Sequence, residues 1–503
     1  MMKFINKRTY IAALGSAALL LGSSCSDFLD EENKSDYTQE NYFQTAEHAE
    51  AAINTLYSEL RFVSDGSGTY GESPFMMLEF PTGLLNTEVG QSQANRDLRN
   101  LTTNAENNYL INWWQRSFKS VANANLAIER IPDIDMNEGD KQRLIGEAKF
   151  MRAFNYFNLV RIFGKVPLIL EPVDANSELL YPERTEQAQV YEVIVQDLKD
   201  AEEAGLPDTD NTGRVSLGAV KTLLSSVYLT MAGYPLQAGD EYYKLAADKA
   251  EEVIDNFDYR LFDTYAELHD KKLENTGEFI FQNQYLAGAN ITNGLTAWLL
   301  PRSKKISVFS DEYGVMYPTQ AFINSHETGD KRVEEQQFYF TEYPSIENPD
   351  VMVDFGGSYI FKYFNEEAAL NTAQNDLNWT FFRYAEVLLT YAEAGFEAYG
   401  PTAKVLDAVN QIRDRADLPY FDASVTREDI WTERFHELSF ENKTWFDMVR
   451  RRKVLDLETG QWEDFIGHEF SYGPKLTEKY LLFPVPQREI SNNTKLLPNN
   501  TGW

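Results

Sequence analysis

The sequence predicts a mainly α-helical protein, a degenerate tetratricopeptide-like superhelix of helix pairs with long irregular, loop-rich insertions and a few short strands. Apolar side chains recur at helical spacing in many separate segments, and these segments follow one another in pairs joined by short Gly/Pro connections. Small residues such as Ala250 and Gly395 stand where paired helices must approach closely. The spacing between pairs varies along the chain, so we expect a degenerate array rather than a regular one.

Each helix is predicted from its apolar spacing and from the residues that end it. Ala49, Ile53 and Leu56 mark the apolar face of the first helix, and Pro132 ends the second. Gly164 ends the third, and later helices end at similar Gly and Pro positions. The predicted helices span residues 45–60, 112–131, 144–160, 191–204, 217–231, 242–255, 381–399, 402–415 and 428–450.

Two long stretches lack helical spacing. Residues 61–111 are rich in Gly, Asn, Ser and Thr, and residues 257–380 alternate aromatic and polar side chains. Short strands are expected at 279–284 and 359–363. Long non-helical insertions in a helical body are usually binding surfaces, so we expect ligand contacts in these two stretches.

Residues 1–24 have the organisation of a lipoprotein signal peptide. Three basic residues within the first eight precede an apolar stretch that is too short to span a bilayer, for which about 20 residues are needed. Small residues then lead into Cys25, the single cysteine of the chain, which excludes an intrachain disulfide. We therefore expect acylation of Cys25, an acidic linker within residues 25–37, and one body spanning residues 38–503.

The charge balance limits the kind of ligand. With 78 acidic and 46 basic side chains, the chain has a net charge of −32. Nucleic-acid binding needs a basic surface that releases counterions from phosphates, so the sequence excludes this class of function. The basic run Arg450–Lys453 is too short to reverse this and is interpreted as a solvated helix end. The negative field also favours a neutral or weakly charged ligand.

The apparent catalytic and metal-binding motifs do not meet their structural requirements. A GxGxxG pattern at residues 66–71 follows a helix, whereas dinucleotide binding needs a preceding strand. The five histidines are scattered, so no local histidine metal cluster is expected. Glu386 and Glu393 share a helical face and could be posed as a glycosidase pair, but Arg383 offers Glu386 an ordinary ion pair. We therefore expect no catalytic residues, no cofactor and no metal ligands.

Ordered motifs along nearly the whole mature chain resemble those of one known family. The most characteristic stretch runs from Gly146 to Leu168 and contains GEAKFMRAF and FGKVPL. The joint occurrence of the motifs is specific, and the chain is similar to the SusD/RagB-type nutrient-uptake lipoproteins. The further motifs are Glu40–Phe43, Gly213-Arg214, Tyr317–Thr319, Arg383–Leu389, Glu433-Arg434, Phe483–Pro486 and Gly502-Trp503.

This resemblance implies a location and a function. Such proteins are lipid-anchored in the outer membrane, face the cell exterior and are not enzymes. They capture a glycan or another nutrient and deliver it to a SusC-like TonB-dependent β-barrel transporter, over which they act as a hinged lid. The resemblance thus implies that this chain captures an oligo- or polysaccharide.

Sugar binding requires an exposed aromatic ring beside hydrogen-bonding side chains, because a sugar ring has an apolar face and a rim of hydroxyls. The two insertions supply residues of both kinds. Trp113 and Trp114 follow a helical stripe and are assigned to the core instead. The candidate glycan-binding residues are Tyr70, Phe75, Phe80, Asn95, Arg96, Tyr285, Asn290, Asn293 and Trp298.

Two other functions stay open at this point. A helical glycoside hydrolase or lyase would cleave a polysaccharide. A repeat scaffold with a protein ligand would bind no sugar. A glycan-binding screen combined with product analysis separates the three hypotheses.

Overall fold

The computed structural model describes residues 43–65, 73–88, 92–174 and 176–503. The expected signal peptide, Cys25 and the acidic linker lie outside the described residues, and so does Tyr70. The described chain is mainly helical with short strands, which confirms the predicted fold class.

The secondary-structure elements have the following bounds in chain order. The helices are α3 (Ala46–Leu60), α4 (Gln93–Arg99), α5 (Asn108–Arg130), α6 (Glu138–Phe163), α7 (Gln187–Glu202), α8 (Leu217–Ala232), α9 (Asp240–Asn256), α10 (Leu295–Leu299), α11 (Gln320–Asn324), α12 (Tyr384–Tyr399), α13 (Ala403–Arg415), α14 (Arg427–Glu437), α15 (Thr444–Arg451) and α16 (Gln487–Asn492). The strands are β1 (Leu85–Asn86), β2 (Phe279–Asn283), β3 (Tyr317–Pro318), β4 (Tyr339–Pro344), β5 (Met352–Ile360), β6 (Trp379–Arg383), β7 (Lys453–Leu455) and β8 (Trp462–Asp464).

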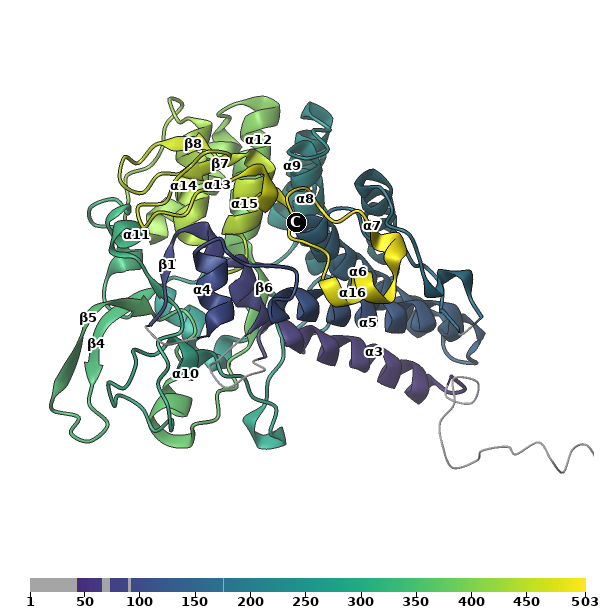
Figure 1. Cartoon of the computed structure of the whole chain (residues 1–503), viewed down its shortest axis with the longest axis horizontal. Coiled ribbons are helices and arrows are strands. Elements are labelled where there is room, and N and C mark those ends of the chain that lie inside the picture. Colours follow the sequence, from purple (N-terminus) through teal and green to yellow (C-terminus); the bar gives the residue numbers. More distant parts are fainter. Residues whose placement is uncertain (1–42, 66–72, 89–91, 175) are drawn as a thin grey trace, which may run out of the picture.

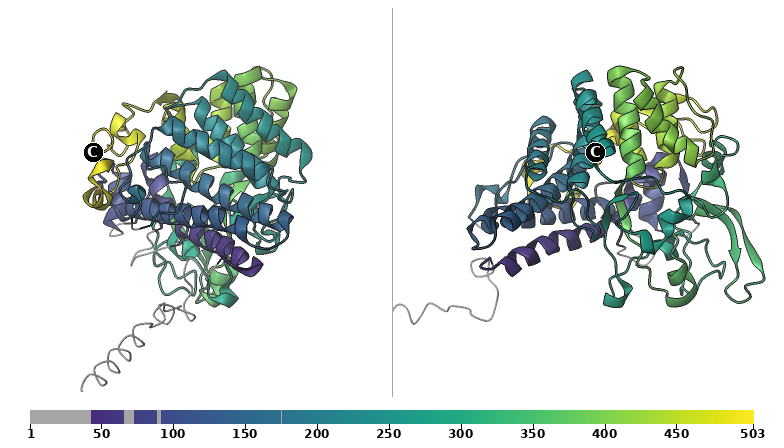
Figure 2. Two further views of the ribbon diagram at one scale, coloured as in Figure 1. Left: turned by 90° about the vertical axis from the view of Figure 1, so that its right-hand side faces the viewer. Right: turned by 180° about the vertical axis from the view of Figure 1, so that it is seen from behind.

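Consecutive helices pack on one another. Helices α3 and α5 to α9 gather at one end of the molecule, and the β4–β5 hairpin projects at the other (Figure 1). Helix α5 packs on α6, α6 on α7, α8 on α9, and α9 on α12, and the view from behind in Figure 2 shows the same succession. Gly146 allows α6 and α7 to approach closely, because an added Cβ would lie 2.3 Å from the Cβ of Ala204. This is the paired-helix arrangement that the sequence predicts.

Local sequence explains where several helices begin and end. The side chains of Thr45 and Asn137 accept hydrogen bonds from backbone N–H groups in the first turns of α3 and α6. Thr426 forms a capping box with Asp429 at the start of α14. Helix α6 ends at Gly164, whose φ of 71° favours glycine.

The predicted helix over residues 381–399 is wrong at its start. Residues up to Arg383 form strand β6, which pairs antiparallel with β2, and α12 begins only at Tyr384. Aromatic residues at this point satisfy both helical and strand spacing, and the partner strand decides between them. Strand pairing therefore shortens the predicted helix.

The predicted helix over residues 428–450 is wrong in its middle. The chain turns between α14 and α15, where Phe440 and Asn442 have positive φ values of 65° and 60°. The Tyr363 hydroxyl donates to the Phe440 carbonyl at 2.6 Å, and Lys362 Nζ donates to two further carbonyls near the turn, both at 2.9 Å. These hydrogen bonds from another segment satisfy carbonyls that a continuous helix would have paired internally.

The described strands pair two by two and antiparallel: β1 with β3, β2 with β6, β4 with β5, and β7 with β8. Strand β2 matches the prediction at 279–284, and the prediction at 359–363 overlaps the end of β5. Every residue of β2 is buried, and the Phe281 ring stacks on that of Phe381 with centroids 5.5 Å apart. The β2–β6 pair thus joins the helical body to the second insertion.

The hydrophobic core extends through the helices and into both insertions. Trp113 and Trp114 are buried, as predicted. A smaller cluster around Phe340 and Phe364 lies beneath the β4–β5 hairpin. Within the described ranges, no helix is both long enough and apolar enough to span a bilayer.

Candidate functional site

The predicted aromatic site residues that the structure describes are buried. The exposed fraction is 0% for Phe75 and Phe80, 6% for Tyr285 and 9% for Trp298. Phe75 and Phe80 lie on tight 3-10 turns that direct them inward, and the Phe75 ring packs on Trp379 with centroids 4.9 Å apart. The expectation that these rings present an exposed platform to a sugar is therefore wrong. The stretch that contains Phe75 and Phe80 has the composition of a surface loop but folds into the core.

The predicted polar site residues are divided between core and surface. Asn95 is buried and accepts a hydrogen bond from the Tyr109 hydroxyl. Asn293 is buried and donates to a backbone carbonyl at 3.0 Å. Arg96 is half-buried on α4, and Asn290 is exposed in the left-handed backbone region. A glycan-binding role for Arg96 and Asn290, which reach solvent, stays a prediction.

Tyr285 links the two insertions although it is buried. Its hydroxyl lies 2.7 Å from the Ser64 hydroxyl and donates to Asp65 Oδ1 at 2.7 Å. Burial raises the pKa of Asp65, and the hydrogen bond from Tyr285 opposes that rise. Beside Asp65 lies a polar cavity of about 380 Å³, lined by Ser58, Glu59, Phe62, Asp65, Pro74, Asn112, Arg116 and Lys119.

A different set of residues combines partly exposed tyrosine rings with polar side chains. The rings of Tyr317 and Tyr359 stack with centroids 5.0 Å apart and planes inclined by 26°. Tyr359 is buried beneath the half-buried Tyr317, and its hydroxyl donates to Glu88 Oε1 at 2.8 Å. Tyr317 also lies opposite Asn86 in the β1–β3 ladder. We call this set the tyrosine surface; its members are Asn86, Glu88, Arg99, Tyr317, Tyr359 and Tyr472.

Arg99 connects the two ends of the tyrosine surface. Its guanidinium donates to Asn86 Oδ1 at 2.5 Å and lies 3.8 Å above the centroid of the Tyr472 ring. Burial and the nearby charge of Glu88 raise the pKa of Tyr317, and Arg99 partly opposes them. The Tyr317 hydroxyl is therefore protonated at neutral pH and can donate a hydrogen bond to a ligand.

Sequence reasoning missed most of the tyrosine surface. Its residues come from β1 and the loop after it, α4, β3, β5 and the loop that follows β8, and most of these segments lie far apart in the chain. One available signal was the alternation of aromatic and polar residues in the second insertion, which contains Tyr317 and Tyr359. Alternation indicates a strand with two unlike faces, but it does not show which face reaches solvent.

The carboxylates that could be posed as a glycosidase pair are closed off from solvent. Glu386 and Glu393 are each 3% exposed. Glu386 lies 2.7 Å from Lys443 Nζ, and Glu393 pairs with Arg450 and Arg451 at 2.6 and 2.5 Å. A glycosidase pair must flank a cleft that admits the sugar. These carboxylates instead hold helices together.

Two charge interpretations from the sequence are wrong. The basic run Arg450–Lys453 is not a solvated helix end, because the Arg450 and Arg451 side chains are only 5% and 3% exposed. Arg383 does not pair with the carboxylate three residues along the chain; its Nη1 lies 2.7 Å from Glu437 Oε1. The helical spacing rule fails there because Arg383 ends a strand and its side chain points toward α14.

A paired-helix scaffold with half-buried tyrosine rings beside polar side chains has the features of a binding protein. Comparison with known proteins agrees with this class. The SusD family model matches residues 186–503, and a model described as "starch-binding associating with outer membrane" matches residues 27–229. The chain belongs to the SusD family, whose members are non-catalytic binding proteins.

Relatives match over nearly their whole length. SusD-like protein P2 of Formosa agariphila is 28% identical, with 96% of this chain and 98% of that protein covered. The crystal structure of a SusD superfamily protein from Parabacteroides distasonis has a TM-score of 0.88 at 39% identity, covering 93% of this chain and 100% of that one. A laminarin-binding SusD-like protein shares the fold, with a TM-score of 0.75 at 22% identity and coverage of 92% and 100%.

Proposed function

We propose that this protein captures an oligo- or polysaccharide at the cell surface and delivers it to a SusC-like TonB-dependent transporter. The tyrosine surface carries the proposal, because a half-buried ring beside amide, carboxylate and guanidinium groups offers both kinds of contact that a sugar needs. Membership of the SusD family supports it, as do a family model named for starch binding and a relative named for laminarin binding.

The ligand is a neutral or weakly charged glycan. A net charge of −32 repels polyanions over the whole surface. Within the tyrosine surface, the positive charge of Arg99 and the negative charge of Glu88 both act on Tyr317, so this site adds no excess positive charge to overcome that repulsion.

Affinity electrophoresis of the full chain in gels containing starch, laminarin or xyloglucan tests this function. At least one polysaccharide should retard the wild-type protein. Tyr317→Ala and Tyr472→Ala should each weaken retardation by up to about ten-fold, the effect of losing an aromatic contact. Tyr420→Ala is the matched control, because Tyr420 is 64% exposed in the loop between α13 and α14.

The other two functional classes predict different results in the same experiment. Release of new reducing ends by the wild-type chain would support a hydrolase or lyase. An absence of retardation by any polysaccharide would support a scaffold without sugar affinity. Equal loss of retardation in the Tyr420→Ala control would show that the tyrosine surface is not the site.

The proposal also includes an anchor and a partner. An acylated Cys25 would hold the protein in the outer membrane facing the exterior, each buried methylene contributing about 0.8 kcal/mol. Cys25→Ala should then move the protein from the membrane fraction to the soluble fraction. The wild-type protein should co-purify with a TonB-dependent barrel from outer membranes in mild detergent. Retention of the variant in membranes would contradict the anchor, and purification without any barrel would contradict the partner.

A further inference from the structure

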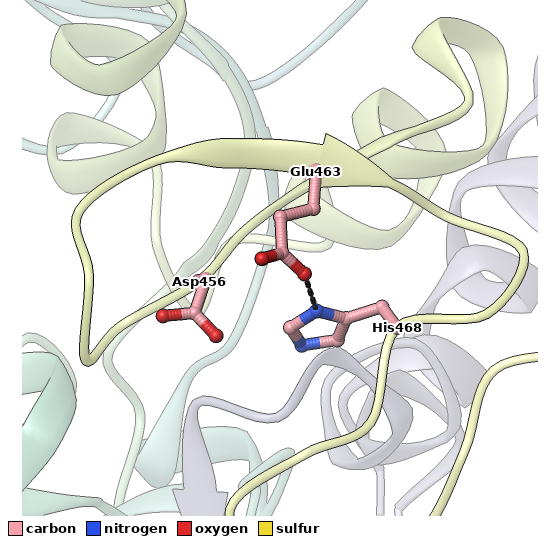
Figure 3. A group of neighbouring side chains, drawn as sticks. All are labelled: Asp456, Glu463 and His468. Atoms are coloured by element: carbon pink, nitrogen blue, oxygen red, sulfur yellow. Dashed lines mark hydrogen bonds and ion pairs between the residues drawn. The ribbon is translucent and has the colours of Figure 1, made fainter.

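Two carboxylates and an imidazole converge at the β7–β8 hairpin. Asp456 directly follows β7, Glu463 lies in β8, and His468 follows β8 after a short loop. Each offers one ligand atom, and the three atoms lie within 4.8 Å of one another. Figure 3 shows the three side chains directed toward one point. We call them the hairpin cluster.

The five histidines are scattered along the chain, and this spacing predicts no local histidine metal cluster. His468 is the one histidine in the hairpin cluster, and its companions are acids from opposite sides of a hairpin turn. Strand pairing brings them together, so no sequence motif marks them. None of the three belongs to the tyrosine surface.

The groups in the hairpin cluster are held in place by contacts of their own. Asp456 Oδ1 accepts backbone hydrogen bonds from Glu458 at 3.1 Å and Thr459 at 2.6 Å. A carboxylate has about four lone-pair positions, so acceptor capacity remains. The His468 ring is buried and meets the Phe470 ring edge-on, with centroids 5.1 Å apart. The imidazole therefore has a fixed orientation before any ligand binds.

The hairpin cluster places carboxylate oxygens of Asp456 and Glu463 beside an imidazole nitrogen of His468, all within 4.8 Å of one another. Carboxylate and imidazole groups are ligand types that metal ions bind in proteins.

We propose that Asp456, Glu463 and His468 bind one divalent transition-metal ion of the zinc class. An imidazole ligand favours zinc and its neighbours over calcium and magnesium, which prefer oxygen ligands alone. Three protein ligands leave a fourth tetrahedral position for water.

The observed spacing suits such an ion. His468 Nδ1 lies 3.1 Å from Glu463 Oε2. Two ligand atoms bound to one tetrahedral zinc at about 2.0–2.2 Å are separated by roughly 3.3 Å. The pair already has that separation, and only Asp456 must move closer. The Glu463 side chain is 48% exposed, so it can adjust to the ion without disturbing the core.

The ion would stabilise the loop that follows β8. That loop returns to pack Phe470 against Gly83, where an added Cβ would lie 2.3 Å from the ring. It also carries Tyr472, whose hydroxyl donates to the Arg99 carbonyl at 3.2 Å. A metal bound by the hairpin cluster would therefore act as a structural clip between the β7–β8 hairpin and this loop.

Zinc titration of the full chain tests the proposal. The protein is purified without a polyhistidine tag, stripped with EDTA, dialysed free of chelator and titrated with ZnCl2 by calorimetry. One zinc should bind per chain, and zinc should raise the melting temperature, because a ligand of the folded state stabilises it. With cobalt in place of zinc, the visible absorption spectrum should show tetrahedral coordination.

Four variants make the result specific. Glu463→Gln, Asp456→Asn and His468→Asn each remove one ligand and should lower zinc affinity by at least about ten-fold. Glu458→Gln removes an exposed acid from the same turn and should leave affinity unchanged. Glu463 is an exposed residue, so its variant keeps the test valid even if His468→Asn misfolds. The proposal is overturned if zinc does not bind saturably at micromolar concentrations, or if the ligand variants bind zinc as tightly as Glu458→Gln does.

Discussion

Replacing Glu393 by glutamine removes the charge that holds two buried arginines of α15 against α12. Glu393 Oε2 lies 2.6 Å from Arg450 Nη2 and 2.5 Å from Arg451 Nη2, and all three side chains are at most 5% exposed. In the variant, Asp447 would be left among Arg434, Arg450 and Arg451, at 2.7, 2.9 and 3.8 Å. The net charge of these buried groups would then rise from +1, three arginines against two carboxylates, to +2.

The expected loss is about 3–5 kcal/mol of unfolding free energy, because breaking a buried ion pair leaves an uncompensated charge. The pKa of Glu393 supports this magnitude. Burial alone would raise it, but the charges of Arg450 and Arg451 lower it from 4.5 to about 2. A change of this size corresponds to about 3 kcal/mol. Because the folded-state pKa is the lower one, this stability is present above pH 4.5 and is lost as the pH falls toward 2.

Urea unfolding of wild type and variant at pH 7 measures the loss. Glu397→Gln is the matched control on the same helix, since Glu397 pairs at 2.9 Å with the half-exposed Arg427. The half-exposed Arg427 lets solvent screen this pair, although Glu397 is only 14% exposed, so the pair should contribute less than about 1 kcal/mol. Between pH 4.5 and 2, Glu393→Gln should also lose less stability than the wild type does. A variant within about 0.5 kcal/mol of the wild type at pH 7 would refute the ion-pair reasoning.

Gly146→Ala should destabilise the protein by about 1–3 kcal/mol, because the added Cβ would lie 2.3 Å from the Cβ of Ala204. An unchanged melting temperature would show that α6 and α7 can separate at no cost. Thr426→Ala should cost about 1 kcal/mol in urea unfolding by removing the capping box with Asp429, whereas Thr426→Ser should retain most of that stability. Burial lowers the pKa of His326 from 6.5 to about 4 in the folded chain. As the pH falls from 6.5 to 4, the unfolded chain therefore takes up a proton before the folded chain does, and the free energy of unfolding decreases. His326→Gln should flatten the dependence of unfolding free energy on pH between 6.5 and 4. An unaltered dependence would contradict a lowered pKa of His326.

Helices whose apolar face and end signals lie within one segment could be located from the sequence. The helix predicted at 217–231 is α8, Leu217–Ala232, and the predicted end at Gly164 is the end of α6. Their periodicity and terminal residues are local features, so no knowledge of the partner helix is needed.

Elements that depend on another segment were predicted less well. The turn between α14 and α15 accepts hydrogen bonds from Lys362 and Tyr363, which lie in the loop after β5. Apolar spacing continues through the turn, so the sequence alone shows a single helix. The strand β6 was predicted as helix for the same reason, because its partner β2 lies in the other half of the second insertion.

The sequence did not show which aromatic residues are exposed and so available to a ligand. Phe75 and Tyr285 lie in loop-rich stretches, yet both are buried, whereas Tyr317 and Tyr472 reach solvent beside Arg99. Composition indicates how often a residue type is exposed, but the exposure of one ring depends on which segments cover it.

Local sequence was enough to establish the helical class, the family and the net charge, because periodicity, ordered motifs and composition are carried by the linear chain. Contacts between distant segments decided which rings reach solvent and which carboxylates are neutralised by arginines. The pairing of β7 with β8 decided that Asp456, Glu463 and His468 meet. Solvent exposure and ion pairing are properties of neighbours in space. The order of residues along the chain does not determine those neighbours until the chain has folded.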